Sequence, residues 1–158
     1  MLVRKYRPGE EPELWQLFFN TIRTVNLGDY TAEQVRVWAP EDTDPERWRA
    51  RIEGICPWVC VEEGDVIVGY ADLQDSGYID HFFVHHAWQR RGVGRRLMET
   101  IETEARARRI PELSAEVSVT ARPFFEAFGF TVVEVKDTEV EGLVMRNFAM
   151  TRRLAEDA

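Results

Sequence analysis

The sequence predicts a mixed α/β fold in which helices pack on a β-sheet. Short apolar runs of strand length alternate along the chain with longer runs whose apolar residues recur every three or four positions. The 158 residues suit one domain, and a content of 44% hydrophobic and 30% charged residues is ordinary for a globular protein. We therefore expect a single domain over residues 1–158.

The first third of the chain is predicted to form a short strand followed by three helices. The strand covers residues 2–6, where apolar and polar residues alternate. Thr31 and Asp44 are suitable N-caps, and Pro45 fits the first position of the third helix. The helices are expected after Pro8–Pro12, over residues 31–38 and over residues 45–52. The buried side of the first helix is expected to contain Leu14, Trp15, Leu17, Phe18 and Ile22.

The rest of the chain is predicted to alternate strands with helices. Apolar residues at a four-residue repeat from Val93 to Ala105 give one long helix a buried side, and Gly129 can end a short helix in the left-handed conformation. The strands are expected over residues 58–61, 66–73, 77–84, 113–119, 131–136 and 143–152, the last two joined across Asp137–Gly142. The helices are expected over residues 92–109 and 124–128.

The loop before the long helix is the strongest candidate for a ligand site. Gly92 and Gly94 lie between a strand-like run that ends at Val84 and the start of the helix. Glycine permits unusual dihedral angles, and the first amides of a helix lack acceptors and lie at the positive end of its dipole. Further positive charge comes from Arg90, Arg91, Arg95 and Arg96. This loop is therefore predicted to bind an anion, and a diphosphate suits it best.

Two common phosphate-binding motifs do not fit this loop. A Rossmann fingerprint needs a third glycine where Leu97 stands, and a P-loop needs Gly-Lys-Ser/Thr, which is absent. The string from the strand through Gln89-x-x-Gly92-x-Gly94 instead resembles the acyl-CoA-binding motif of the GCN5-related N-acetyltransferases, the GNAT superfamily.

A second motif of the same family is found further along the chain. The stretch Ser118-Val-Thr-Ala-Arg-Pro-Phe-Phe-Glu-Ala-Phe-Gly-Phe130 resembles the family signature Asn-x-x-Ala-x-x-Phe-Tyr-Glu-x-x-Gly-Phe. The N-terminal helices, with Trp38-Ala-Pro40 and Glu46-Arg-Trp48, look like a YafP-like bacterial subgroup. The resemblance covers nearly the whole chain.

The resemblance implies the GNAT fold, with a single mixed, mostly antiparallel sheet flanked by helices. The strands at 77–84 and 113–119 would splay apart, and acetyl-CoA would lie between them as co-substrate, with no metal. Main-chain groups of the first strand would bind the pantetheine arm, and the loop amides would bind the diphosphate. The cofactor-binding residues implied are Phe82, Phe83, Val84, Gln89, Arg90, Arg91, Gly92, Val93, Gly94, Arg95, Ser118, Ala121, Phe124 and Phe125.

The resemblance also implies direct attack of an amine on the thioester within a ternary complex. The amide of Val84 would stabilise the developing oxyanion. Asp80 is the first candidate for the base that deprotonates the acceptor ammonium, because it precedes Val84 by four residues and would share its strand face. Tyr78 would lie on the same face, and Glu116 is the second candidate base.

Two positions depart from the family pattern. Ser118 stands where the family often has Asn, and Phe125 stands where many members have the Tyr that protonates the leaving thiolate. The thiol of coenzyme A titrates at about 8–9, so its thiolate can leave without that acid, at a cost of roughly 10²-fold at most. Phe125 keeps open the alternative of a non-catalytic acyl-CoA-binding regulatory module. A domain that binds another nucleotide, such as ATP or NAD, is a third alternative.

Composition limits the partners and the compartment. The net charge of −8 argues against nucleic acid, and no run approaches about 18 apolar residues, which argues against a membrane. Cys56 and Cys60 are expected to be reduced, buried strand residues, and His85 and His86 to point to opposite strand faces, so no metal site is predicted. We expect a cytoplasmic monomer or homodimer that acts on a small-molecule amine or a peptide amine.

Overall fold

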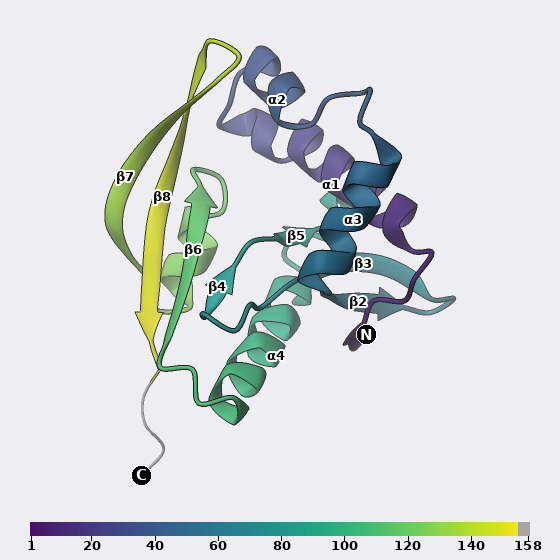
Figure 1. The fold of residues 1–158 in the computed structure, drawn as a ribbon, viewed down its shortest axis with the longest axis vertical. Coiled ribbons are helices and arrows are strands. Elements are labelled where there is room, and N and C mark those ends of the chain that lie inside the picture. The colour runs from purple at the N-terminus through teal and green to yellow at the C-terminus, as the bar shows by residue number, and fades with distance from the viewer. Residues whose placement is uncertain (155–158) are drawn as a thin grey trace.

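The computed structural model describes residues 1–154 and forms two four-stranded half-sheets with helices on both faces (Figure 1). In spatial order the first half contains β1 (Leu2–Lys5), β2 (Trp58–Glu62), β3 (Val66–Ala71) and β5 (Phe82–Val84). The second contains β4 (Tyr78–Ile79), β6 (Glu112–Ser118), β8 (Leu143–Arg153) and β7 (Thr131–Val140). The predicted mixed α/β fold is confirmed.

The helices have the predicted order. They are α1 (Glu11–Thr24), α2 (Ala32–Trp38), α3 (Pro45–Ile55), α4 (Val93–Ala107) and α5 (Arg122–Ala127), with short 3₁₀ turns η1 (Asn26–Gly28) and η2 (His86–Trp88). The predicted caps are confirmed. Thr31 and Gln34 form a reciprocal capping box at α2, and the Asp44 carboxylate accepts from two amides at the start of α3. Gly129 follows α5 with a φ of +87°.

The sheet divides within the strand that was predicted over residues 77–84. β4 pairs in parallel with β6, whereas β5 pairs antiparallel with β3. Between them the amides of Asp80 and His81 donate to Oδ1 of Asp72, at 2.8 and 2.7 Å. Because the Asp72 side chain accepts from both amides, these amides cannot donate to a neighbouring strand, and the strand pairing is interrupted here. The prediction of one continuous strand was therefore wrong, and the predicted splay begins at this break.

The two faces of the first half-sheet are covered by different helices. The buried side of α4, with Val93, Leu97, Ile101 and Ala105 as predicted, packs against β2 and β3. The opposite face is covered by α1 and α3, whose buried residues form a second cluster with Tyr70. In Figure 1, α1 and α3 cross in front of β3 and β5, and α4 lies below them.

The contact between α4 and β3 depends on Gly69. A Cβ added to Gly69 would lie 2.6 Å from Cγ1 of Val93 and 3.1 Å from Cδ1 of Leu97. We expect Gly69→Ala to lower the free energy of unfolding by about 1–3 kcal/mol, because α4 must move away from the sheet. Urea denaturation measures this change. Gly54→Ala is the control, since its Cβ meets nothing within 4 Å and alanine is the better helix former.

The C-terminal hairpin is longer than predicted. Residues 137–140 were expected in a loop, but they continue β7, and the turn contains only Glu141 and Gly142, with φ of 50° and 81°. The extension is held by Arg146 of β8, which donates to both carboxylate oxygens of Asp137 at 3.0 and 3.2 Å. This cross-strand pair explains why a polar segment forms a strand.

Two further predictions were wrong at residues that follow a helix or strand. Cys56 is exposed at the end of α3 with a φ of 44°, whereas Cys60 is buried in β2 as expected. The rings of His85 and His86 do not lie on opposite faces but stack, with centroids 4.4 Å apart. The strand has already ended at Val84, so the alternation of a strand no longer applies.

Candidate functional site

The loop from Gln89 to Arg95 has the open main-chain donors that the sequence predicts. Gly92 caps α4 with a φ of +86°, Arg90 is also left-handed at +62°, and the first bond within the helix runs from the amide of Arg96 to the Gly92 carbonyl at 3.1 Å. Among residues 1–154, none accepts a hydrogen bond from the amides of residues 89–95. Seven consecutive amides are therefore available to a ligand.

Three arginines surround this loop without a carboxylate partner. Arg90, Arg91 and Arg95 are exposed, and none forms an ion pair within the part of the chain that the structure describes. The guanidinium of Arg91 lies 4.9 Å from the centre of the Trp88 ring, and that of Arg95 lies 5.3 Å from the centre of the Phe128 ring. Their charge is thus free to attract an anion while the aromatic rings restrict their positions.

β5 provides a free strand edge beside the loop. The amide of His85 donates to the Val68 carbonyl, and the register pairs Tyr70 with Phe83. In an antiparallel ladder the neighbouring residues, Phe82 and Val84, then direct their amides and carbonyls away from β3. β5 is the edge of its half-sheet, so these groups face the split between the two halves.

The carbonyl of Val84 is held by two side chains. Nε2 of Gln89 donates to it at 2.8 Å, and Oγ1 of Thr21 on α1 donates to it at 3.0 Å. Gln89 was predicted to bind the diphosphate, and the structure shows that its side chain ties the loop to the end of β5. Thr21 was not predicted, because nothing in the local sequence connects α1 to this strand.

The second motif packs against the loop through aromatic rings. A Cβ added to Gly94 would lie 2.9 Å from Cε2 of Phe124, so this glycine allows α5 to approach α4. Phe82 contacts both Phe124 and Phe125, with centroid separations of 5.2 and 5.6 Å, and Phe125 is only 3% exposed. Oγ of Ser118 accepts from the Ala121 amide at 3.1 Å and shapes the turn between β6 and α5.

The candidate base Asp80 does not lie as strand alternation implied. Asp80 lies in the break between β4 and β5, where its Oδ2 accepts from Nη2 of Arg51 at 3.1 Å. Its side chain therefore faces α3, whereas Val84 packs on the side of α4. The prediction that Asp80 and Val84 share a face was wrong because the strand is interrupted between them.

The pKa of Tyr78 is affected by both candidate carboxylates. Burial, together with the charges of Glu116 and Asp80, raises the pKa of Tyr78 to about 12. Its phenol is therefore protonated at neutral pH. Glu116 is exposed on β6 and forms an ion pair of 2.9 Å with Lys136.

A buried hydrogen-bond network extends from Asp80 into the core. Nε of Arg51 donates to Nε2 of His81 at 3.0 Å, and Nδ1 of His81 lies 2.9 Å from the Tyr70 hydroxyl. A guanidinium can only donate, so Nε2 is unprotonated and Nδ1 carries the hydrogen. Burial raises the pKa of the Asp72 carboxyl to about 6, and this carboxyl holds the amides of the break as described above. Strand patterns did not reveal this network.

His81 gives the network a pH dependence that can be measured. Burial lowers the pKa of His81 to about 4, with the charge of Asp80 opposing this shift and that of Arg51 adding to it. Between pH 6.5 and 4 the unfolded chain therefore takes up a proton that the folded chain does not, so stability falls as the pH falls. Protonation of Asp72 acts in the opposite direction below pH 6.

The contribution of His81 can be isolated by comparing the wild type with His81→Gln. We expect the difference in their free energies of unfolding to shift by about 2 kcal/mol against the wild type between pH 7 and 5. Urea denaturation at the two pH values measures it. An equal difference at both would show that His81 titrates alike in the folded and unfolded chain.

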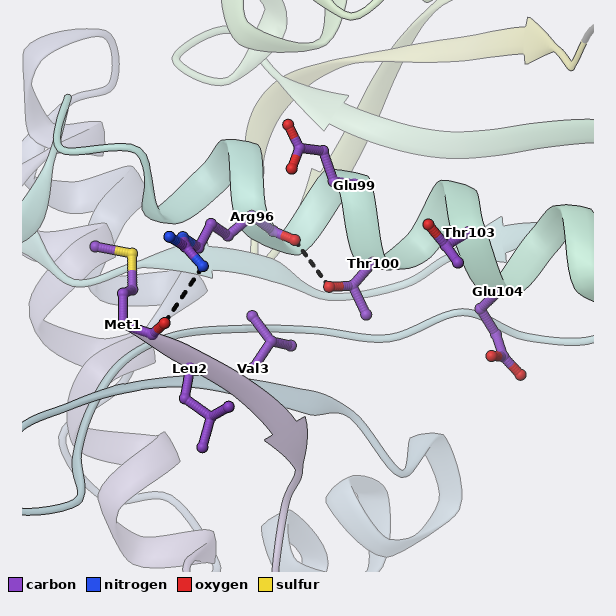
Figure 2. A pocket seen from close by; sticks show the side chains of 8 residues that line it. All are labelled: Met1, Leu2, Val3, Arg96, Glu99, Thr100, Thr103 and Glu104. Carbon is purple, nitrogen blue, oxygen red and sulfur yellow. Dashed lines mark hydrogen bonds between the residues drawn. The ribbon is translucent and has the colours of Figure 1, made fainter.

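A surface depression lies between α4 and the first three residues of the chain, outside the predicted site. It is lined by Met1, Leu2, Val3, Arg96, Glu99, Thr100, Thr103 and Glu104 (Figure 2). Arg96 was expected to add charge to the glycine loop, but it donates to the Met1 carbonyl at 3.3 Å (Figure 2). Apart from Arg96, none of the residues predicted for the site lines this depression.

Comparison with known proteins identifies the family of this fold. Residues 26–152 match the family model described as an acetyltransferase (GNAT) domain. The chain is 31% identical over 149 residues to the uncharacterized N-acetyltransferase YafP of Escherichia coli strain K12, covering 94% of this chain and 93% of that protein. The fold is that of an acyltransferase. The chain belongs to the GNAT family of acetyltransferases.

Solved structures agree with this assignment. A GCN5-related N-acetyltransferase from Rhodopseudomonas palustris has a TM-score of 0.90 and 29% identity, covering 97% of this chain and 95% of that one. YncA from Salmonella typhimurium, solved with acetyl-CoA, has a TM-score of 0.70 and 20% identity over 100% of this chain and 96% of that one, so it shows the shared fold. The predicted family and the YafP-like subgroup are confirmed.

Two findings concern other ligands and the membrane. Within residues 1–154, no three His, Cys, Asp or Glu side chains are grouped so that they could hold a metal ion. In the same range, no helix has both the length and the apolar character needed to cross a membrane.

Proposed function

We propose that this protein transfers the acetyl group of acetyl-CoA to an amine by direct attack in a ternary complex. The observation that carries the proposal is the set of open amides from Gln89 to Arg95 next to the free edge of β5. The loop amides would bind the diphosphate, with Arg90, Arg91 and Arg95 around it. The pantetheine would lie along the edge of β5 and pair with the outward main-chain groups of Phe82, because the Val84 carbonyl is already held by Thr21 and Gln89.

The residues at the break would carry out the proton transfer. The Val84 amide would donate to the thioester oxygen as negative charge develops there, while its carbonyl stays fixed by Thr21 and Gln89. Asp80 would accept the proton of the acceptor ammonium, directly or through water. The arrangement favours Asp80 over Glu116, because Arg51 holds Asp80 in place, whereas Glu116 is exposed and paired with Lys136. With Phe125 buried among aromatic rings, the thiolate would leave without the family tyrosine.

The test is acetyl transfer by the purified protein. We expect free thiol to appear when acetyl-CoA is mixed with a panel of small amines and peptide amines. If acetyl-CoA binds but no amine reacts, the alternative of a non-catalytic acyl-CoA-binding module is correct. A thermal-shift assay that finds preferential binding of ATP or NAD would instead contradict the assignment of the loop to coenzyme A.

The proposal also covers the organisation of the chain. We propose one GNAT domain over residues 1–158, acting in the cytoplasm as a monomer or homodimer without nucleic acid. Strand pairing at both ends of the described chain supports the single domain, since β1 pairs with β2 and β8 pairs with β6. Residues 155–158 lie outside the part that the structure describes.

A further inference from the structure

A small depression lies on α3, the helix whose Arg51 donates to the candidate base Asp80. It has a volume of about 110 Å³ and is lined by Thr43, Asp44, Arg47, Trp48 and Arg51. Arg51 connects it to the split in the sheet, because the same guanidinium donates to Asp80 and to His81. In Figure 1 this helix, α3, lies beside β5 in front of the first half-sheet, and α4 lies below it.

The lining of this depression is basic. It contains two guanidinium groups and one carboxylate, and that carboxylate, on Asp44, already accepts from the amides of Glu46 and Arg47 at the start of α3. The Arg47 side chain is exposed and forms no ion pair within residues 1–154. Arg51 uses Nε and Nη2 in its two contacts, so Nη1 is left for a ligand. This pattern contrasts with the net charge of −8 of the whole chain.

We propose that the acceptor is an amine that also carries a carboxylate, as an amino acid does, and that Arg51 and Arg47 bind this carboxylate while Asp80 receives the ammonium. The inference rests on the proposed acetyl transfer and assigns its substrate class. The opposite charges on Arg51 and Asp80, 3.1 Å apart, match the two charges of such a zwitterion.

The chemistry of the groups favours this assignment over a simple amine. A guanidinium binds a carboxylate through parallel N–H donors, which fixes the orientation of the ligand as well as its charge. Oδ1 of Asp80 accepts no hydrogen bond within residues 1–154, so it can accept from an ammonium without breaking the contact of Oδ2 with Arg51. Trp48 is only 8% exposed and adds an apolar wall for the carbon atoms between the two charges.

The experiment compares amino acids with their carboxamides, which keep the amine but lose the negative charge. We expect the wild type to favour the acids over the amides at least tenfold in kcat/KM. Arg51→Met should lower this ratio by roughly 10- to 100-fold, the contribution of hydrogen bonds to a charged group, and Arg47→Met by roughly tenfold. The KM for acetyl-CoA should stay the same in both variants.

Arg49→Met is the matched control on the same helix. Arg49 is exposed, pairs only with Glu46 among residues 1–154 and does not line the depression, so the ratio of Arg49→Met should equal that of the wild type. Arg47→Met guards against a folding defect of Arg51→Met, because the Arg47 side chain has no partner to lose among the described residues. The assignment is wrong if the wild type acetylates amides as well as acids, or if neither variant changes the ratio.

The test also separates this inference from the proposed function. Turnover of any amine supports acetyl transfer, whatever the ratio between acids and amides. If no amine reacts, calorimetric titration of the same amino acids into coenzyme A-saturated protein tests the depression directly. Binding that is lost in Arg51→Met supports the carboxylate site, and the absence of binding contradicts it.

Discussion

Replacing Gly92 by valine is expected to weaken acetyl-CoA binding by roughly 100-fold or more, equivalent to the loss of two charge-assisted hydrogen bonds. Gly92 has a φ of +86°, which a β-branched residue avoids at a cost of about 1–2 kcal/mol. A valine that relaxes toward negative φ would turn the amides of residues 89–95 away from a common point. Calorimetric titration with acetyl-CoA measures the change.

Gly142 provides the matched control for this substitution. It has a φ of +81°, and like Gly92 its added Cβ would meet nothing within 4 Å. Gly142→Val should therefore cost a similar amount of stability in the turn between β7 and β8 without changing acetyl-CoA affinity. Equal affinities in the wild type and both variants would place the diphosphate elsewhere.

The loop was predictable because its signal is local. Two glycines and four arginines within seven residues, placed between a strand and a helix, define both the backbone path and the charge. The resemblance to the family then supplied the splay between strands, which no periodicity contains. Two corrections concern this loop. The missing Cβ of Gly94 accommodates Phe124, and Arg96 donates to the Met1 carbonyl instead of adding charge to the loop.

The arrangement around Asp80 was not predictable, because it depends on contacts distant in the sequence. Asp72 ends the strand by taking the amides of Asp80 and His81, and Arg51 reaches both residues from 29 and 30 positions away. The alternation of residue types over 77–84 predicts one continuous strand. Such alternation does not show whether the backbone amides donate to a neighbouring strand or, as here, to a side chain. The clue was an acidic residue, Asp72, directly after the apolar strand Val66–Ala71, where burial demands a partner.

Replacing Asp80 by asparagine is expected to lower kcat/KM by roughly 10²–10³-fold, the usual contribution of a general base. The amide oxygen of asparagine can still accept from Arg51, so the break between β4 and β5 should keep its shape. The variant should bind acetyl-CoA as the wild type does, because the Asp80 side chain faces α3 and bonds to Arg51 there. Steady-state release of free thiol measures the rate.

The pH profile distinguishes a base from a structural role. Without the base, only acceptor molecules that are already neutral can attack, and their fraction rises about tenfold per pH unit below an amine pKa near 10. The defect of Asp80→Asn should therefore shrink as the pH is raised from 7 to 9, whereas a misfolded site would be impaired at every pH. Glu116→Gln is expected to follow the wild-type profile. The reverse result, with a pH-dependent defect in Glu116→Gln alone, would assign the proton transfer to β6.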